Sequence, residues 1–200
     1  MRLPLIALVC LLLGACGTTE VRKFYYVLEQ PAVKTSVEKS GRGATSNKSR
    51  KRIVLEPLLL PDHLRLPNLL FKQQQNMIHP ARQHLWGDAL DRSISRFLAL
   101  QLTSRNRRYQ VESLLEAQNP TSDYRIKLRI DQFYPTYQNV AVLSGHLWIS
   151  DRKKRVLVNR PFSKQLLLEE DGYPHAVQQL QQLLLQLTDD LDAALIEAGL

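Results

Sequence analysis

The side chains best suited to catalysis or metal binding in this chain of 200 residues are five histidines and several carboxylate runs. These histidines are His63, His79, His84, His146 and His175. They are scattered along the chain, without the short paired spacing that a metal site needs, and runs such as Glu169–Asp171 are typical of solvated helix ends. The sequence also lacks a glycine-rich phosphate loop, a Gly-x-Ser-x-Gly turn and a His-Glu-x-x-His motif. We therefore expect neither an enzyme nor a site for a metal or cofactor.

Cys16 differs from these residues because its neighbours fit one covalent modification. A positive start and the apolar run 3–13 form a signal-peptide core, too short for a membrane span of about 20 residues. The residues directly before the cysteine are Leu13, Gly14 and Ala15. This pattern resembles the lipobox of bacterial lipoproteins, in which small residues admit the chain to the peptidase and the thiol carries a thioether-linked diacylglycerol. The resemblance implies cleavage before Cys16, followed by S-diacylglycerol attachment and N-acylation with fatty acids such as palmitate.

The cysteine count agrees with an acylated first residue. Cys10 leaves with the signal peptide 1–15, so the mature chain keeps a single thiol and no internal disulfide. A single free thiol would be exposed to oxidation in the envelope, so a lone cysteine there is expected to be covalently modified, here by lipid. Gly17 stands where an Asp signals retention in the inner membrane, which favours the periplasmic face of the outer membrane. The alternative is an ordinary secretory signal with two incidental cysteines.

The net charge of +8 at pH 7 is concentrated in one segment. Residues 34–52 hold seven basic side chains and one acidic side chain, whereas residues 53–200 hold 17 basic and 16 acidic ones. Serine, threonine and glycine dominate the rest of 34–52, which is typical of a flexible loop. We expect this loop close to the anchor, either contacting anionic headgroups or cell-wall polymer or forming a solvated insertion without a specific role. The candidate contacts are Lys48, Arg50, Lys51 and Arg52. An envelope location argues against nucleic acid as a partner.

Hydrophobic periodicity predicts the secondary structure of the remainder. We expect strands over 24–28, 53–61, 124–131, 140–150 and 156–168, a hairpin over 69–78, a helix from His84 to about Thr103, and a second helix from Gly172 to Gly199. The three last strands predict an antiparallel meander. The leucine stripe of the second helix is expected to pack on the chain's own sheet, with a partner helix in an oligomer as the alternative. Arg125, Lys127 and Arg129 share one strand face, where ion pairs with neighbouring strands are expected.

Four stretches resemble the ABC-type transport auxiliary lipoprotein family, the PqiC-like proteins. They are residues 24–28, 55–67, 84–92 and the C-terminal helix, and from the first to the last they span nearly all of the mature chain. The resemblance implies an α/β (α+β) fold, with a mixed, largely antiparallel sheet packed by two main amphipathic helices. It brings no catalytic residues. The expected organisation is a signal peptide at 1–15, an anchor and first strand at 16–33, the basic loop at 34–52, and the rest of a single domain at 53–200.

The same resemblance implies an accessory role in lipid movement between the inner and outer membranes. The expected protein is an outer-membrane lipoprotein that docks a periplasmic MCE-domain lipid transport protein. Candidate residues of the partner surface are Leu60, Leu64, Leu66 and Trp86. The alternative function is a structural or assembly lipoprotein of the envelope that binds peptidoglycan or anionic lipid. A homo-oligomer is compatible with either function.

Overall fold

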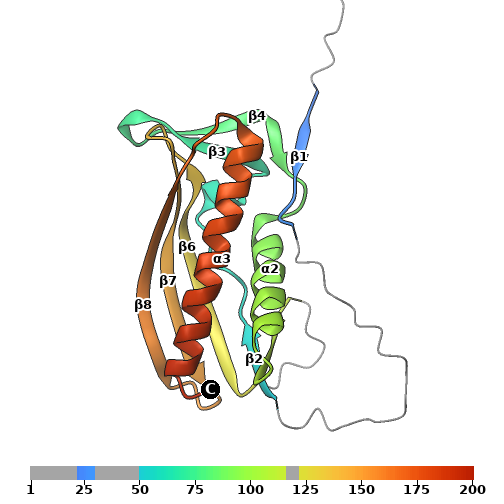
Figure 1. Cartoon of the computed structure of the whole chain (residues 1–200), viewed down its shortest axis with the longest axis vertical. Helices are drawn as coiled ribbons and strands as arrows, with labels where there is room; N and C mark the ends of the chain where they lie inside the picture. Colours follow the sequence, from blue (N-terminus) through green and yellow to red (C-terminus); the bar gives the residue numbers. More distant parts are fainter. Residues whose placement is uncertain (1–21, 30–49, 116–121) are drawn as a thin grey trace, which may run out of the picture.

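The computed structural model describes residues 22–29, 50–115 and 122–200 (Figure 1). The lipobox, Cys16 and Lys48 lie outside the described residues. The strands are β1 (Phe24–Tyr26), β2 (Lys51–Leu55), β3 (Asn68–Lys72), β4 (Ile78–Trp86), β5 (Tyr109–Ser113), β6 (Tyr124–Pro135), β7 (Val140–Asp151) and β8 (Val156–Leu167). The helices are α2 (Leu90–Arg105) and α3 (Tyr173–Glu197), with short 3-10 turns at η2 (Asp62–Arg65) and η3 (Gln74–Asn76).

The strands form two sheets. The larger sheet has the order β5-β2-β6-β7-β8, in which β2 runs parallel to β5 and β6, and β6, β7 and β8 form an antiparallel meander. The smaller sheet has the order β1-β4-β3, in which β1 is parallel to β4 and β3 is antiparallel to it. Helix α3 packs on β6, β7 and β8, and α2 packs on β5 and α3 (Figure 1). The expected α+β class, with a mixed sheet and two main helices, is confirmed.

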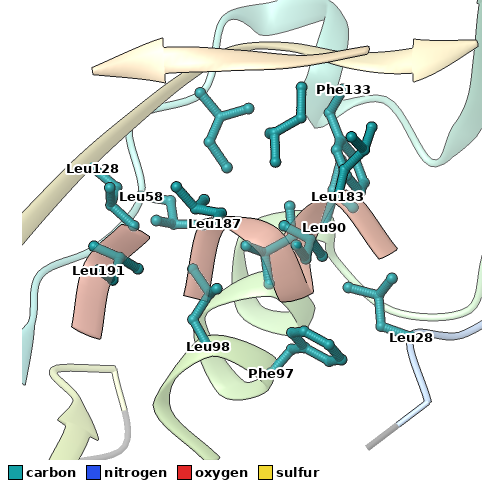
Figure 2. Close-up of a cluster of buried hydrophobic side chains, with 14 of the residues drawn as sticks. Leu28, Leu58, Leu90, Phe97, Leu98, Leu128, Phe133, Leu183, Leu187 and Leu191 are labelled. Atoms are coloured by element: carbon teal, nitrogen blue, oxygen red, sulfur yellow. The ribbon is translucent and has the colours of Figure 1, made fainter. Parts of the chain in front are cut away.

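The leucine stripe of α3 lies inside the molecule. Leu180, Leu184, Leu187 and Leu191 have at most 1% of their surface exposed, and they belong to one continuous apolar core. Figure 2 shows Leu183, Leu187 and Leu191 among core side chains from α2, β6 and the segment after β2. Each leucine removed from water in this way contributes about 1.5–3 kcal/mol to folding. The leucine stripe thus packs in the chain's own core, as expected, and the alternative that a partner helix covers it is wrong.

Helix α2 begins later than its sequence periodicity indicates. The apolar spacing predicts a helix from His84, but residues 84–86 end strand β4 and the helix starts at Leu90. Trp86, Leu90 and Ile94 recur every fourth residue and are all buried. Because the strand end and the helix face the same core, the spacing continues across the break between them. Gly87 lies in that break, where its N–H donates to the carbonyl oxygen of Tyr26 at 2.7 Å.

Further boundaries differ from the sequence-based expectation. Strand β2 begins at Lys51, so the last two residues of the predicted loop 34–52 are paired with β5. Strand β5 was not predicted, because its alternation rests on Tyr109 and Val111 alone and is too short to stand out. The strand predicted over 53–61 already ends at Leu55, and the hairpin predicted over 69–78 is present but extends to Trp86. The other predicted strands and the C-terminal helix are confirmed, within a few residues at their ends.

Candidate functional site

The His84 side chain on β4 connects strand β1 to helix α3. Its ring stacks on Phe24 and Tyr26 of β1, with centroids 5.1 and 5.7 Å away, and on Tyr173 of α3, with centroids 3.8 Å apart. A hydrogen bond of 2.8 Å joins the Tyr26 hydroxyl to Nδ1 of His84. Burial, and secondarily the proximity of Tyr173, raises the pKa of Tyr26. The strand that directly follows the predicted anchor is therefore held by aromatic contacts to both a sheet and the longest helix.

The end of the domain at which β1 enters also contains three chain reversals. Tyr137, in the β6–β7 turn, donates its N–H to the carbonyl oxygen of Lys72 at 2.9 Å, and Leu168 donates to Asn139 at 2.7 Å. A hollow of about 340 Å³ lies between these segments and the start of α3. Its lining is Phe71, Gln73, His79, Pro135, Asn139, Leu168, Glu170, Asp171, Gly172, Tyr173 and Ala176. These contacts bring the β3–β4 turn, the β6–β7 turn and the segment before α3 together at the upper end in Figure 1, where β1 also begins.

The candidate partner surface does not have the composition that the sequence suggested. Leu60, Leu64 and Trp86 are 7%, 2% and 7% exposed, so they belong to the core and cannot form a docking surface. Trp86 stacks on Phe133, with centroids 6.0 Å apart, because it ends a strand over the sheet and does not lie on a helix surface. Of these four candidates, Leu66 alone is exposed, at 44%.

Leu66 borders a hollow of about 390 Å³ between the Leu66-Pro67 segment and the start of α2. Arg65 and Arg92 supply cations there, and Asp88 pairs with Arg92 at 3.3 Å. The hollow therefore offers an exposed leucine within a ring of charged groups. The lining residues are Arg65, Leu66, Pro67, Trp86, Gly87, Asp88, Ala89, Leu90 and Arg92.

The described residues of the basic loop lie at the opposite end of the domain from β1. Lys51 donates its N–H to the carbonyl oxygen of Arg108, and Arg52 donates to the carboxylate of Asp123 at 3.0 Å. The β2–β6 register and the β6–β7 register then place the β7–β8 turn at this same end. Here the exposed cations are Arg50, Lys51, Arg52, Arg107, Arg108, Arg152, Lys153, Lys154 and Arg155, which we call the basic end. Arg50, Lys51 and Arg52 thus lie at the end opposite β1, the first described strand after the predicted anchor, and their expected nearness to the anchor itself stays a prediction.

The basic face of β6 is occupied by contacts within the sheet. Arg125 pairs with Glu56 at 3.7 Å and Arg129 pairs with Asp131 at 2.9 Å. Lys127 and Arg129 also lie over the ring of Trp148 on β7, at 5.5 and 6.0 Å from its centroid. The expected ion pair with a neighbouring segment is confirmed for Arg125, whereas Arg129 pairs within its own strand.

The described residues contain neither a metal centre nor a membrane-spanning helix. Among residues 22–29, 50–115 and 122–200, no three His, Cys, Asp or Glu side chains are grouped to hold a metal ion. Within the same ranges, no helix combines the length and hydropathy needed to cross a bilayer.

The model of the ABC-type transport auxiliary lipoprotein component matches residues 26–192, which run from β1 nearly to the end of α3. The chain belongs to this family. Two curated relatives, both named intermembrane transport lipoprotein PqiC, come from Escherichia coli K12 and Shigella flexneri. Each is 23% identical over 178 residues, which are 88% of this chain and 88% of the relative.

Two solved structures share the fold. One, described as an uncharacterized protein, is 21% identical, with a TM-score of 0.72 over 87% of this chain and 99% of that chain. The other, from Xanthomonas campestris, is 11% identical, with a TM-score of 0.71 over 88% of this chain and 96% of that chain. The family resemblance seen in the sequence is thus confirmed, and the chain is a lipoprotein component that assists transport in the cell envelope.

Proposed function

We propose that this protein is an outer-membrane lipoprotein that serves an intermembrane lipid transport system by docking an MCE-domain protein in the periplasm. The observation that carries the proposal is the family match over residues 26–192, with the lipobox at Leu13–Cys16 on its N-terminal side. The names of the two PqiC relatives support intermembrane transport as the process. Gly17 favours the outer membrane over the inner one.

The proposed mechanism is mechanical. Diacylglycerol and an N-linked acyl chain on Cys16 anchor the chain, since stable attachment takes more than one acyl chain. The stacking of His84 on both β1 and α3 fixes the first strand after the anchor to the body of the domain. A rigid domain loses little conformational entropy on docking, and a specific contact needs only roughly 1,000 Å² of buried surface. Leu66 and the charged hollow beside it are the part of the predicted partner surface that is accessible.

The second candidate function is a structural envelope lipoprotein that binds peptidoglycan or anionic lipid. The basic end favours it, because exposed cations from three separate segments gather there. Each basic residue near an anionic membrane contributes about 1 kcal/mol to attachment, and salt weakens this attraction. Binding through the basic end is therefore expected to be released by high salt, whereas docking through Leu66 is not.

Replacement of Cys16 tests the anchor. We expect the Cys16→Ala variant to appear in the soluble periplasmic fraction, whereas the wild-type chain sediments with outer membranes after density-gradient separation. Cys10→Ala is the matched control, because Cys10 lies in the predicted signal peptide and its loss leaves the anchor intact. Mass spectrometry of the mature N-terminus must find lipid on residue 16. A Cys16→Ala variant that sediments with membranes as completely as the wild-type chain would refute acyl anchoring.

A further inference from the structure

We propose that the end of the domain at which β1 enters rests on the lipid leaflet that holds the acyl chains, so that the domain stands upright with its basic end away from that membrane. This inference rests on the proposed acyl anchor at Cys16. The proposed contact surface, which we call the apolar end, consists of Phe24, Tyr25, Met77, Tyr137 and Leu167.

The apolar end carries large side chains that the fold leaves in contact with solvent. Its five residues are between 40% and 67% exposed. They come from β1, the β3–β4 turn, the β6–β7 turn and the last residue of β8. Apolar side chains gain free energy when they leave water, and these five have no cover within the described part of the chain.

The five residues lie at one end of the molecule. The N–H of Tyr137 bonds the end of β3, and Leu167 pairs with Val140 at the start of β7. On the other side, Phe24 is joined through His84 to Tyr173 at the start of α3. Figure 1 shows these segments at the upper end, with β2 at the lower one. An extended lipid surface can therefore contact them together.

Chain length limits how far this end can lie from the leaflet. Eight peptide units separate Cys16 from Phe24, and a fully extended chain covers about 27 Å over that number. The far end of the sheet is more distant, because the twelve residues of β7 span about 37 Å. An anchored domain thus meets its own leaflet most readily with the apolar end, whereas the basic end is out of reach when the domain is upright.

The chemistry of the apolar end suits the bilayer interface. Aromatic side chains concentrate at the headgroup level of a bilayer, where the ring contacts acyl chains and a polar group contacts water. Phe24 and Tyr25 fit this level, and they directly follow the cations Arg22 and Lys23. The Arg22 guanidinium lies 5.5 Å from the centre of the Phe24 ring, so a cation accompanies the exposed aromatic side chain. Glu170 and Asp171 line the hollow at the same end and offset these cations. Apolar contact should therefore dominate, and high salt should not detach this end.

Depth measurements on the acylated full-length chain test the orientation. With Cys16 acylated, a new cysteine is the only free thiol of the mature chain and accepts a single environment-sensitive fluorophore. Tyr25→Cys and Met77→Cys report on the apolar end, and Lys153→Cys reports on the basic end. The labelled proteins are reconstituted into phosphatidylethanolamine–phosphatidylglycerol vesicles that contain lipids with a quencher in the upper acyl chain.

We expect strong quenching at positions 25 and 77 and none at position 153, unchanged in high salt. Equal weak quenching at all three positions would overturn the inference but not the acyl anchor, because the anchored domain would then have no preferred orientation at the membrane. Quenching at 153 that disappears in high salt would also overturn it, in favour of attachment through the basic end.

A second measurement covers the case in which Cys16 carries no lipid and the proposed anchor fails. The unacylated chain, made as Cys16→Ala, is then mixed with the same vesicles and sedimented. We expect the added changes Tyr25→Ser and Met77→Ser to weaken vesicle binding roughly tenfold. Val156→Ser and Leu157→Ser, which remove exposed side chains beside the basic end, should leave it unchanged. Equal binding of the two double variants would refute the apolar end as a lipid contact.

Discussion

The imidazole ring of His84 lies nearly parallel to the phenol ring of Tyr173, with centroids 3.8 Å apart and an angle of 21° between the planes. The two residues are 89 positions apart in the sequence. This contact joins the small sheet to the long helix of the main core, and β1 rests against it. It therefore adds a side-chain connection between β1 and the core to the backbone pairing of β1 with β4.

We expect His84→Ala to lower the free energy of unfolding by about 1–3 kcal/mol, because it removes three aromatic contacts and the partner of the Tyr26 hydroxyl. Urea denaturation measures the loss. Hydrogen exchange should quicken at Phe24–Tyr26 before other strands respond. His79→Ala, on the exposed part of β4, is the control and should change stability little. Unchanged exchange in β1 of the His84 variant would show that the stack does not hold the strand.

Tyr109 and Asp192 connect β5 to α3 through a hydrogen bond of 2.5 Å from the phenol to the carboxylate. Burial, followed by this bond to Asp192, raises the pKa of Tyr109 well above its usual value. A raised pKa stabilises the fold while the phenol is neutral in both states, so the contribution is complete below about pH 10 and is lost as pH rises further. At pH 8, Tyr109→Phe should cost about 1–2 kcal/mol.

The pH dependence separates the buried phenol from simple packing. The stability difference between wild type and Tyr109→Phe should shrink when urea denaturation is repeated at pH 10 and pH 11, because only the wild-type chain must then keep the phenol protonated. A difference that stays constant across this range would mean that the phenol in the folded protein does not resist ionisation.

Gly145 allows β6 and β7 to approach each other at the bulge near Ile130. A Cβ atom at this position would lie 1.9 Å from the carbonyl oxygen of Arg129, which is backbone and cannot move aside. Gly145→Ala should therefore abolish folding or lower the melting temperature by well over 10 °C. Gly87→Ala is the milder comparison, since its Cβ would lie 3.0 Å from the Val27 side chain and no closer than 3.4 Å to backbone, at the carbonyl oxygen of Tyr26. Equal melting temperatures for the two variants would disprove this assignment of strain.

Sequence patterns located most elements because burial on one side repeats regularly. The alternation in Tyr124–Asp131 and the leucine stripe of α3 correspond to faces that the core covers. The helix start was misplaced because Trp86 and Leu90 face one core from a strand and a helix. Periodicity shows which residues are buried. It does not show that the backbone changes from strand to helix near Gly87, because the buried residues keep the same spacing on both sides.

The candidate surfaces were harder to predict, because they depend on contacts between distant segments. Leu60 and Leu64 lie between prolines and were candidates for the partner surface, yet Leu60 is buried and the 3-10 turn at η2 directs Leu64 into the core. The position of Arg52 at the basic end follows from β2 pairing with β5 and β6, which no local pattern reveals. Tyr25, Met77 and Tyr137 gave no signal, since single exposed apolar residues are common.

Site-specific photo-crosslinking tests the accessible part of the predicted partner surface. A photoreactive residue in place of Leu66 should crosslink to an MCE-domain protein in intact cells. The same residue in place of Leu59, which has a similar exposure but lies between β2 and η2, is the matched control and should not crosslink. Crosslinks from position 59 and none from position 66 would move the docking surface to another face.

The central claim is that the anchored domain serves a lipid-conducting partner, and the most direct test is to identify what it holds in the envelope. The full-length chain is purified by affinity after chemical crosslinking in cells, and the bound material is identified by mass spectrometry. We expect an MCE-domain protein, retained through a high-salt wash and lost when Cys16→Ala releases the chain from the outer membrane. Recovery of cell-wall fragments or anionic lipid without any MCE-domain protein would contradict the transport function and favour a structural lipoprotein.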